Sequence, residues 1–402
     1  MAAVDASSIL LVTPWLQGGG IERTIQVKAP WLAARGHRVE VVAWHVAERL
    51  SDRPNPVLQA LRAGGVPVRT LPLPDRFHLV RQALRVAAHA TVGRFRIVVG
   101  HELHGNVVAL MAKAFTGGRV RAIAQVHNEP ATYVPTGASP RLMALARRLY
   151  RYADGTVAVA DDLRVAHIAT FGVDPDHVVT IHNPFPLDAI AAAARAPLDL
   201  PATGPAYLVA CGRLTELKGF ADLIRAFAAI RRGRPLRLVI LGDGPERPSL
   251  ERLAAELGVR ADVDLPGFVA NPYAWFGHAR GFVLCSRSEG LANVLVEAMI
   301  CGAPIVSSRC TGAEEVVEDG RTGLLYEPGD IDGLTRALAR LLDAPEAAAE
   351  RACAARERAE SFSEDRILPA LERYYLGQPP DATHRSDSDH RAQRSENRYV
   401  AA

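Results

Sequence analysis

Short runs of apolar, often β-branched residues recur along the chain, and segments with helical spacing of apolar residues separate them. Strands buried on both faces show such near-continuous apolar runs, and helices usually connect parallel strands. We therefore predict an α/β fold with parallel sheets covered by helices. The predicted strands begin at Ser7, His37, Val66, Arg96, Arg121, Gly155 and His177, and then at Tyr207, Leu236, Val263, Gly281, Ala303 and Thr322.

The two series of strands are separated by residues 183–206, which are rich in proline and alanine. A length of 402 residues suits two domains of about 150–200 residues each. We predict two Rossmann-like domains facing a central cleft, over residues 1–185 and 186–360. Residues 361–377 are predicted to form a helix that returns to the N-terminal domain. The polar residues 378–402 have little to bury and are predicted to be a disordered tail.

The most informative chemical pattern is SRSEGLANVLVEAMICGAPIVSS, residues 286–308. A predicted strand ends at Cys285, Glu289 and Gly290 lie in the following turn, and a helix is predicted to begin near Asn293. In open α/β sheets, ligands bind beyond the carboxyl ends of the strands. The strand, turn and helix together favour a binding site over a solvated pair of charges.

The predicted helix start offers backbone N–H groups to an anion, and these belong to Leu291, Ala292 and Asn293. A phosphate is stabilised at such a position by the N–H groups and by the helix dipole. Glu289 in the turn and Glu297 in the early helix would lie on either side of it. Carboxylates bind sugar hydroxyls through charge-assisted hydrogen bonds, so the pair suits a nucleotide sugar.

A second pattern, CGRLTELKGF at residues 211–220, places Arg213 and Lys218 after the first strand of the second series. Two cations at a strand end would neutralise a diphosphate and stabilise it as a leaving group. The chain has three lysines and 44 arginines, so a lysine here indicates a need for a compact point charge. A basic helix start without function is the weaker interpretation, because it opposes the helix dipole.

The loop in LVTPWLQGGGIERT, residues 11–24, contains Gly18, Gly19 and Gly20 between a strand and a helix. Glycines let the backbone approach a ligand closely, but a plain tight turn fits equally well. The loop does not match GxGxxG.

Histidines follow two other predicted strands of the first half. His127 lies in AQVHNEP, where it could hydrogen-bond a sugar hydroxyl or assist proton transfer in catalysis, and His101 and His104 compete for that role. For each of these histidines, a purely structural role is the alternative interpretation.

Charge is distributed unevenly along the chain. Residues 1–185 contain 21 lysines and arginines against 13 acids, and the remainder contains 26 against 31. The basic first half suits an anionic partner such as phospholipid head groups or a lipid pyrophosphate, or is a solvated surface. Within it, residues 139–153 have an amphipathic helical pattern, which fits either a helix packed on a sheet or one lying on a membrane.

The N-terminus lacks a basic region before a long apolar run, and no segment is long and apolar enough to span a bilayer. The five cysteines lack CxxC spacing, so we expect reduced thiols and no zinc site. The expected location is the cytoplasm, with association with the inner face of the membrane as a hypothesis.

Taken together, these motifs resemble glycosyltransferase family 4, a group of retaining enzymes with the GT-B fold. The resemblance covers nearly the whole ordered chain and is closest over residues 207–330, where GRL, KGF, LGDGP, SEGLANVLVEAM, CGAPIVSS and GLLYEPGD occur in the family's order. It is looser in the first half, at GGGIERT and VHN. Ala292 departs from the family pattern, which often has proline there, and Ala160 departs from a common serine.

The resemblance implies an N-terminal acceptor domain and a C-terminal nucleotide-sugar domain. It implies that Arg213 and Lys218 bind the donor diphosphate and that Glu289 binds the sugar hydroxyls. It places Gly19 and Gly20 against the donor phosphate or the acceptor, and His127 against the donor sugar. It assigns Glu297 to the nucleotide ribose and the remaining donor contacts to Gly290, Leu291, Ala292 and Asn293.

By the same resemblance, the expected reaction transfers a hexose or N-acetylhexosamine from a nucleoside-diphosphate sugar to a glycan or lipid-linked acceptor. The expected role is the synthesis of cell-surface polysaccharide or glycolipid. No cofactor, metal or nucleic acid is expected. Three alternatives stay open: a GT-B epimerase or phosphorylase, a nicotinamide-dependent dehydrogenase, and a non-catalytic sugar-nucleotide binder.

Overall fold

The computed structural model describes residues 6–17, 19–50, 53–71, 79–134, 137–198 and 206–378. Gly18 and the predicted tail beyond residue 378 lie outside these ranges. The chain divides into two compact units. Unit 1 comprises the described residues up to Pro184 together with those from Glu364 onward, and unit 2 runs from Phe185 to Ser363.

A seven-stranded parallel sheet forms the centre of unit 1, in the order β5-β2-β1-β6-β7-β8-β9. Its strands are β1 (Ser8–Leu16), β2 (Arg38–Val46), β5 (Val68–Thr70), β6 (Ile97–His101), β7 (Arg121–Val126), β8 (Gly155–Ala158) and β9 (Val178–Thr180). Nearly every residue of β1 is buried, because helices cover both faces of the sheet. A short antiparallel pair, β3 (Arg49–Leu50) with β4 (Arg53–Pro54), is separate from this sheet.

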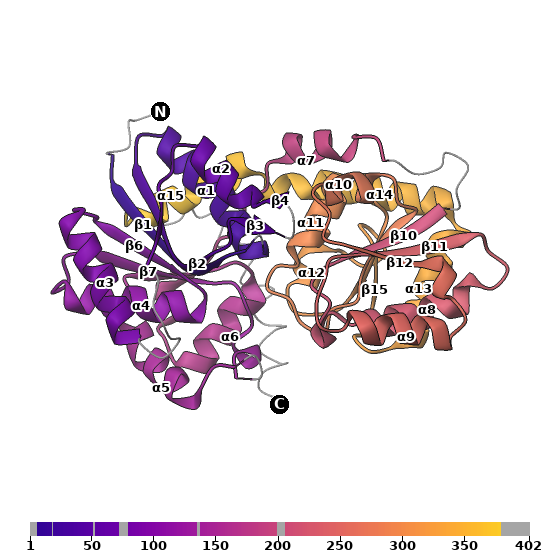
Figure 1. Cartoon of the computed structure of the whole chain (residues 1–402), viewed down its shortest axis with the longest axis horizontal. Coiled ribbons are helices and arrows are strands. Elements are labelled where there is room, and N and C mark those ends of the chain that lie inside the picture. The colour runs from indigo at the N-terminus through magenta and orange to yellow at the C-terminus, as the bar shows by residue number, and fades with distance from the viewer. Residues whose placement is uncertain are drawn as a thin grey trace. The chain divides into compact units, whose positions relative to one another are not determined.

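The helices of unit 1 form two layers, one on each face of the sheet (Figure 1). The first layer contains α1 (Gly20–Ala34), α2 (Pro56–Ala63) and α15 (Glu364–Tyr375). The second contains α3 (Leu79–Val92), α4 (Glu102–Phe115), α5 (Pro140–Leu149) and α6 (Asp161–Phe171). Helix α15 packs against α1 although more than 300 residues separate them along the chain.

A buried carboxylate anchors α15 to unit 1. Glu372 is 2% exposed and accepts hydrogen bonds from Arg35 Nε at 2.8 Å and His37 Nε2 at 2.7 Å. The backbone N–H of Ser7 donates to His37 Nδ1 at 3.0 Å, so Nε2 carries the proton that Glu372 accepts. The helix predicted within residues 361–377 is therefore held on the N-terminal sheet by paired polar groups as well as by apolar packing.

Unit 2 contains a six-stranded parallel sheet in the order β12-β11-β10-β13-β14-β15. Its strands are β10 (Ala206–Cys211), β11 (Leu236–Leu241), β12 (Val263–Gly267), β13 (Gly281–Leu284), β14 (Ile305–Ser308) and β15 (Leu324–Tyr326). The predicted α/β class with two Rossmann-like sheets is thus confirmed.

Helices cover both faces of the sheet of unit 2 as well (Figure 1). On one face lie α8 (Phe220–Arg231), α9 (Arg247–Glu256) and α13 (Ile331–Asp343). On the other lie α7 (Leu187–Ala194), α10 (Pro272–Gly277), α11 (Asn293–Ile300) and α14 (Pro345–Ala359). The short α12 (Ala313–Val316) follows β14.

Each sheet has one place where the direction of strand addition reverses. In unit 1 it lies between β1 and β6, and in unit 2 between β10 and β13. The helices that follow the two strands leave toward opposite faces, so the loops at the carboxyl edge diverge there. Ligands of open α/β folds bind at such a position.

A glycine allows two of these loops in unit 2 to meet. Gly219, just before α8, has φ = 66°, and a Cβ atom added to it would lie 2.1 Å from the carbonyl oxygen of Cys285. Gly233, at the other end of α8, has φ = 75° but nothing within 4 Å of its Cβ position. The two positions share the left-handed backbone and differ in the space around it.

We predict that Gly219→Ala destabilises the chain much more than Gly233→Ala. The left-handed conformation costs both variants about 1–2 kcal/mol, and the clash with Cys285 costs Gly219→Ala a further ~1–3 kcal/mol. Chemical denaturation of the full chain measures the difference. Equal midpoints for the two variants would show that the loops are not in close contact.

Candidate functional site

An ion pair at the carboxyl edge of the unit 2 sheet joins the two sequence motifs. Lys218 Nζ donates to Glu289 Oε1 at 2.6 Å, although the residues are 71 positions apart. Their side chains are 23% and 13% exposed. Burial lowers the pKa of Lys218, but the charge and hydrogen bond of Glu289 more than offset this, and the pKa rises overall. Lys218 is therefore a fully charged cation at neutral pH.

The carboxylate of Glu289 has a second donor that sequence reasoning did not identify. Ser286 Oγ donates to the same oxygen, Oε1, at 2.5 Å. Ser308 Oγ in turn donates to the backbone carbonyl of Ser286 at 2.6 Å. Ser286 and Ser308 are both buried, so the carboxylate is held in one orientation, and its other oxygen, Oε2, has no partner among the described residues. The serine in SRSEG was visible in the sequence, but its contact depends on the turn.

Arg213 lies directly after β10 and Gly212, and its side chain is exposed. Its guanidinium forms no ion pair with any residue that the structure describes. The stem of Lys218 passes the same point, since a Cβ added at Gly212 would lie 3.6 Å from Lys218 Cδ. The described part of the chain therefore places a cation with an ion-pair partner, Lys218, and one without, Arg213, at the same strand end.

The loop after β13 leads into α11, which begins at Asn293 as predicted. Leu291 and Ala292 are each 2% exposed, and within the described chain their N–H groups donate to no acceptor. Ala292 has φ = 53°, a left-handed conformation that proline cannot adopt. Buried N–H groups without a partner at a helix start are suited to an anion.

Glu297 lies one turn into α11 and is 4% exposed. It accepts a hydrogen bond at 3.2 Å from the hydroxyl of Tyr273 on α10. Tyr273 is a second residue that sequence reasoning missed, because it belongs to no motif and contacts Glu297 only through the packing of α10 on α11.

The carboxyl edge of the unit 1 sheet carries a pair of carboxylates beside the glycine loop. Gly19 is the N-cap of α1, and Glu22 Oε2 lies 2.6 Å from the position of a Cβ there. The backbone N–H of Gln17 donates to Glu22 Oε1 at 3.4 Å. Burial raises the pKa of Glu102, at the start of α4, to about 7, and the charge of Glu22 adds to this. Glu102 also has φ = 62°, a strained conformation for glutamate.

The three candidate histidines of unit 1 differ in how far they are buried and in the partners of their ring nitrogens. His101 is fully buried, and its Nδ1 lies 3.2 Å from the carbonyl oxygen of Val12, so it is engaged within the protein. His104 lies in α4 and is half-buried. His127 follows β7, is 5% exposed, and has no hydrogen-bond partner among the described residues for either ring nitrogen.

Two family models together match most of the chain. Residues 18–189 match the family described as Glycosyltransferase Family 4, and residues 205–344 match the family described as Glycosyl transferases group 1. The chain belongs to the glycosyltransferases. This glycosyltransferase thus has one family domain on the unit 1 sheet and the other on the unit 2 sheet.

Relatives and solved structures agree with this assignment. The chain is 37% identical to the lipopolysaccharide core biosynthesis glycosyltransferase LpsE of Rhizobium meliloti over 38% of its own length and 44% of LpsE, so it spans less than half of that relative. It is 29% identical to N-acetylgalactosamine-N,N'-diacetylbacillosaminyl-diphospho-undecaprenol 4-alpha-N-acetylgalactosaminyltransferase of Campylobacter jejuni, over 68% of the chain and 74% of that protein.

Among solved structures, HepE of Anabaena in complex with UDP-glucose superposes with a TM-score of 0.79 at 21% identity, covering 92% of this chain and 99% of HepE. The likeness shows that the glycosyltransferase has the predicted GT-B fold. In the described ranges, no helix combines the length and hydropathy needed to cross a bilayer.

The burial of Lys28 in α1 leads to a prediction about how stability depends on pH. Lys28 is 1% exposed, and burial lowers the pKa of its ammonium group well below the usual range. Between this folded-state pKa and the unfolded value near 10.5, the unfolded chain binds one proton more than the folded chain. The free energy of unfolding therefore rises with pH, by up to about 1.4 kcal/mol per pH unit. Lys28→Met lacks this contribution.

We predict that the wild type gains stability relative to Lys28→Met from about pH 7.5 to 9.5. A Trp275→Phe background removes the one tryptophan of unit 2, so fluorescence during denaturation reports unit 1 alone. A constant difference between the two proteins over this range would mean that Lys28 keeps an ordinary pKa when buried.

Proposed function

We propose that this glycosyltransferase moves a hexose or N-acetylhexosamine from a nucleoside-diphosphate sugar to a hydroxyl group of a glycan or lipid-linked acceptor. The observation that carries the proposal is the Lys218–Glu289 pair beside the exposed Arg213 and the start of α11. The names of the relatives support a role in cell-surface polysaccharide or glycolipid synthesis, and the UDP-glucose bound to HepE supports a nucleotide-sugar donor.

The donor diphosphate would lie between the two cations and the N–H groups of Leu291 and Ala292. Lys218 would then be shared between the diphosphate and Glu289, whose other oxygen accepts from the sugar hydroxyls. Gly290 and Asn293 complete this loop. Glu297, oriented by Tyr273, would accept from the ribose hydroxyls. Gly19, Gly20 and His127 of unit 1 are assigned to the substrate as well.

We assign a retaining mechanism without a protein nucleophile. The bond from the anomeric carbon to the phosphate oxygen breaks while the bond to the acceptor oxygen forms on the same face. The acceptor's proton passes to the departing phosphate oxygen. The protein contributes positioning and stabilises the growing negative charge on the diphosphate. Arg213, Lys218 and the helix dipole supply positive charge there, so we propose that no divalent metal is needed.

Lys218→Ala is expected to lower kcat/KM by about 10²-fold or more, equivalent to roughly 2–4 kcal/mol of transition-state stabilisation. Lys113→Ala, which removes a lysine paired with Asp154 in unit 1, is the matched control and should retain full activity. The assay measures transfer from UDP-, GDP- and ADP-sugars. Activity should survive EDTA, and a near-wild-type rate for Lys218→Ala would refute the assignment.

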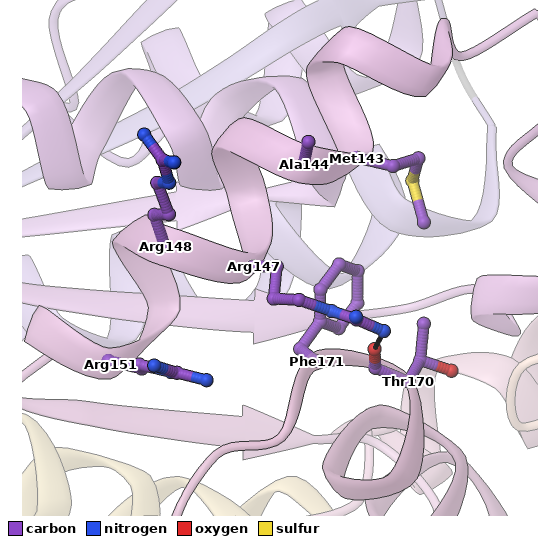
Figure 2. Close-up of a pocket in the computed structure, with 7 residues that line it drawn as sticks. All are labelled: Met143, Ala144, Arg147, Arg148, Arg151, Thr170 and Phe171. Atoms are coloured by element: carbon purple, nitrogen blue, oxygen red, sulfur yellow. Dashed lines mark hydrogen bonds between the residues drawn. The ribbon is translucent and has the colours of Figure 1, made fainter.

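A membrane contact through α5 is the second part of the proposal. Leu142 and Ala146 are buried in the core of unit 1, so this amphipathic helix packs on the protein and does not insert its apolar face into lipid. A cavity of about 500 Å³ is lined by Phe171, by Arg147 and Arg148 of α5, and by Arg151 of the short 3-10 helix that follows (Figure 2). Arg147 donates to the carbonyl of Thr170, whereas Arg148 and Arg151 are exposed and have no ion pair with described residues.

Charge alone would therefore attract α5 and the 3-10 helix after it to anionic lipid. We expect the triple variant Arg141→Gln, Arg148→Gln, Arg151→Gln to bind vesicles of phosphatidylglycerol and phosphatidylethanolamine about 10²-fold more weakly at low salt, at about 1 kcal/mol per arginine. A control triple variant changes three exposed arginines of unit 2: Arg252, Arg336 and Arg340. If the amount of protein that co-sediments with vesicles did not change with salt, with anionic lipid content or with these three arginine substitutions, the contact would be contradicted.

A further inference from the structure

Lys28 of unit 1 is buried without a counter-charge. It lies on the inner face of α1 with Ile25, Ala29 and Leu32, at 1% exposure. No carboxylate among the described residues pairs with it. Burying an amine is costly, and an apolar side chain would fill the same volume at no such cost. A protein that uses lysine only three times therefore has a specific use for this one.

The amine of Lys28 joins the ends of two strands. Its Nζ donates to His101 Nε2 at the end of β6 and to Gln125 Oε1 on β7. Both partners are buried, at 0% and 3% exposure. The contact with Val12 assigns the tautomer of His101. A carbonyl oxygen can only accept, so Nδ1 carries the proton and Nε2 is left to accept from Lys28.

The ring of His101 stacks on that of His127. The ring centroids are 5.6 Å apart, and the planes differ by 18°. His127 is 5% exposed, and neither of its ring nitrogens has a partner in the described chain. A buried imidazole without a hydrogen-bond partner is costly, so a ligand that offers such a partner at this position would be favoured. His127 follows β7 at the carboxyl edge of the sheet, where substrates of such folds bind.

We propose that Lys28 is a positioning residue, which holds the ring of His101 in place so that the stacked ring of His127 is oriented to hydrogen-bond a hydroxyl of the sugar substrate. The inference rests on the proposed function. Burial and then the nearby Lys28 lower the pKa of His127 well below its usual range, so the ring is neutral and can accept as well as donate. The groups facing it from the neighbouring elements are Lys28 on α1 and His101 on β6.

A purely structural lysine would behave differently from a positioning one. If Lys28 only filled space, Lys28→Met would alter stability and leave the contribution of His127 unchanged. If Lys28 orients His127, the two residues are coupled in catalysis, and removing either one removes the same contribution. A double-mutant cycle separates these outcomes.

The experiment measures kcat/KM for wild type, Lys28→Met, His127→Ala and the double variant. We expect Lys28→Met to lower kcat/KM about tenfold or more in the wild type and to have no further effect when His127 is alanine. Lys113→Met, the same change at a half-buried lysine that pairs with Asp154, is the control. Lys28→Met should leave the affinity for the nucleoside diphosphate, measured without its sugar, unchanged. An unchanged affinity would also show that unit 2 of the variant is folded. Independent, multiplicative effects of the two substitutions would overturn the proposal.

Nitrogen NMR of the histidine rings tests the same arrangement without a variant or a substrate. The wild type is expected to show His101 as the Nδ1–H tautomer and His127 as neutral at pH 6. An Nε2–H tautomer at His101 would overturn the proposal even if Lys28→Met failed to fold. If the protein transferred sugar from no sugar nucleotide, the proposed function would be wrong. The NMR test of the His101 and His127 arrangement would be unaffected, because it does not depend on activity.

Discussion

The parallel pairing of β10 with β13 determines where the polar groups of unit 2 meet. The chain leaves β10 through α8 toward β11 and leaves β13 through α11 toward β14, so two loops start side by side and diverge to opposite faces. Lys218 from the first loop and Glu289 from the second then lie within hydrogen-bond distance. Gly219 permits this approach because no side chain separates its Cα from the carbonyl of Cys285.

Unit 1 repeats this plan with different chemistry. Its strand order reverses between β1 and β6. The groups at that edge are a glycine loop, two carboxylates and a buried lysine that is hydrogen-bonded to a histidine. Unit 2 keeps Lys218 charged by pairing it with a carboxylate, whereas unit 1 buries Lys28 with neutral partners. The first arrangement suits binding of phosphate, and the second suits holding neighbouring rings in place.

Much of the fold and part of the site follow from the sequence. Strands buried on both faces have continuous apolar runs, so both sheets were predictable, and Arg213, Lys218 and Glu289 could be assigned to strand ends from the turns beside them. Ser286 and Tyr273 were not predictable as contacts, because each depends on a turn or a helix packing that no motif encodes. Lys28 lies on the apolar face of α1, but helical spacing cannot reveal which polar atoms meet a lysine there.

The most direct test is a crystal structure of the protein with a bound nucleoside-diphosphate sugar. The account predicts the diphosphate within hydrogen-bond distance of the Arg213 guanidinium, Lys218 Nζ and the N–H groups of Leu291 and Ala292, with the sugar against Glu289 and the ribose against Glu297. A diphosphate bound at another edge of the sheet, with these groups making no contact to it, would contradict the account.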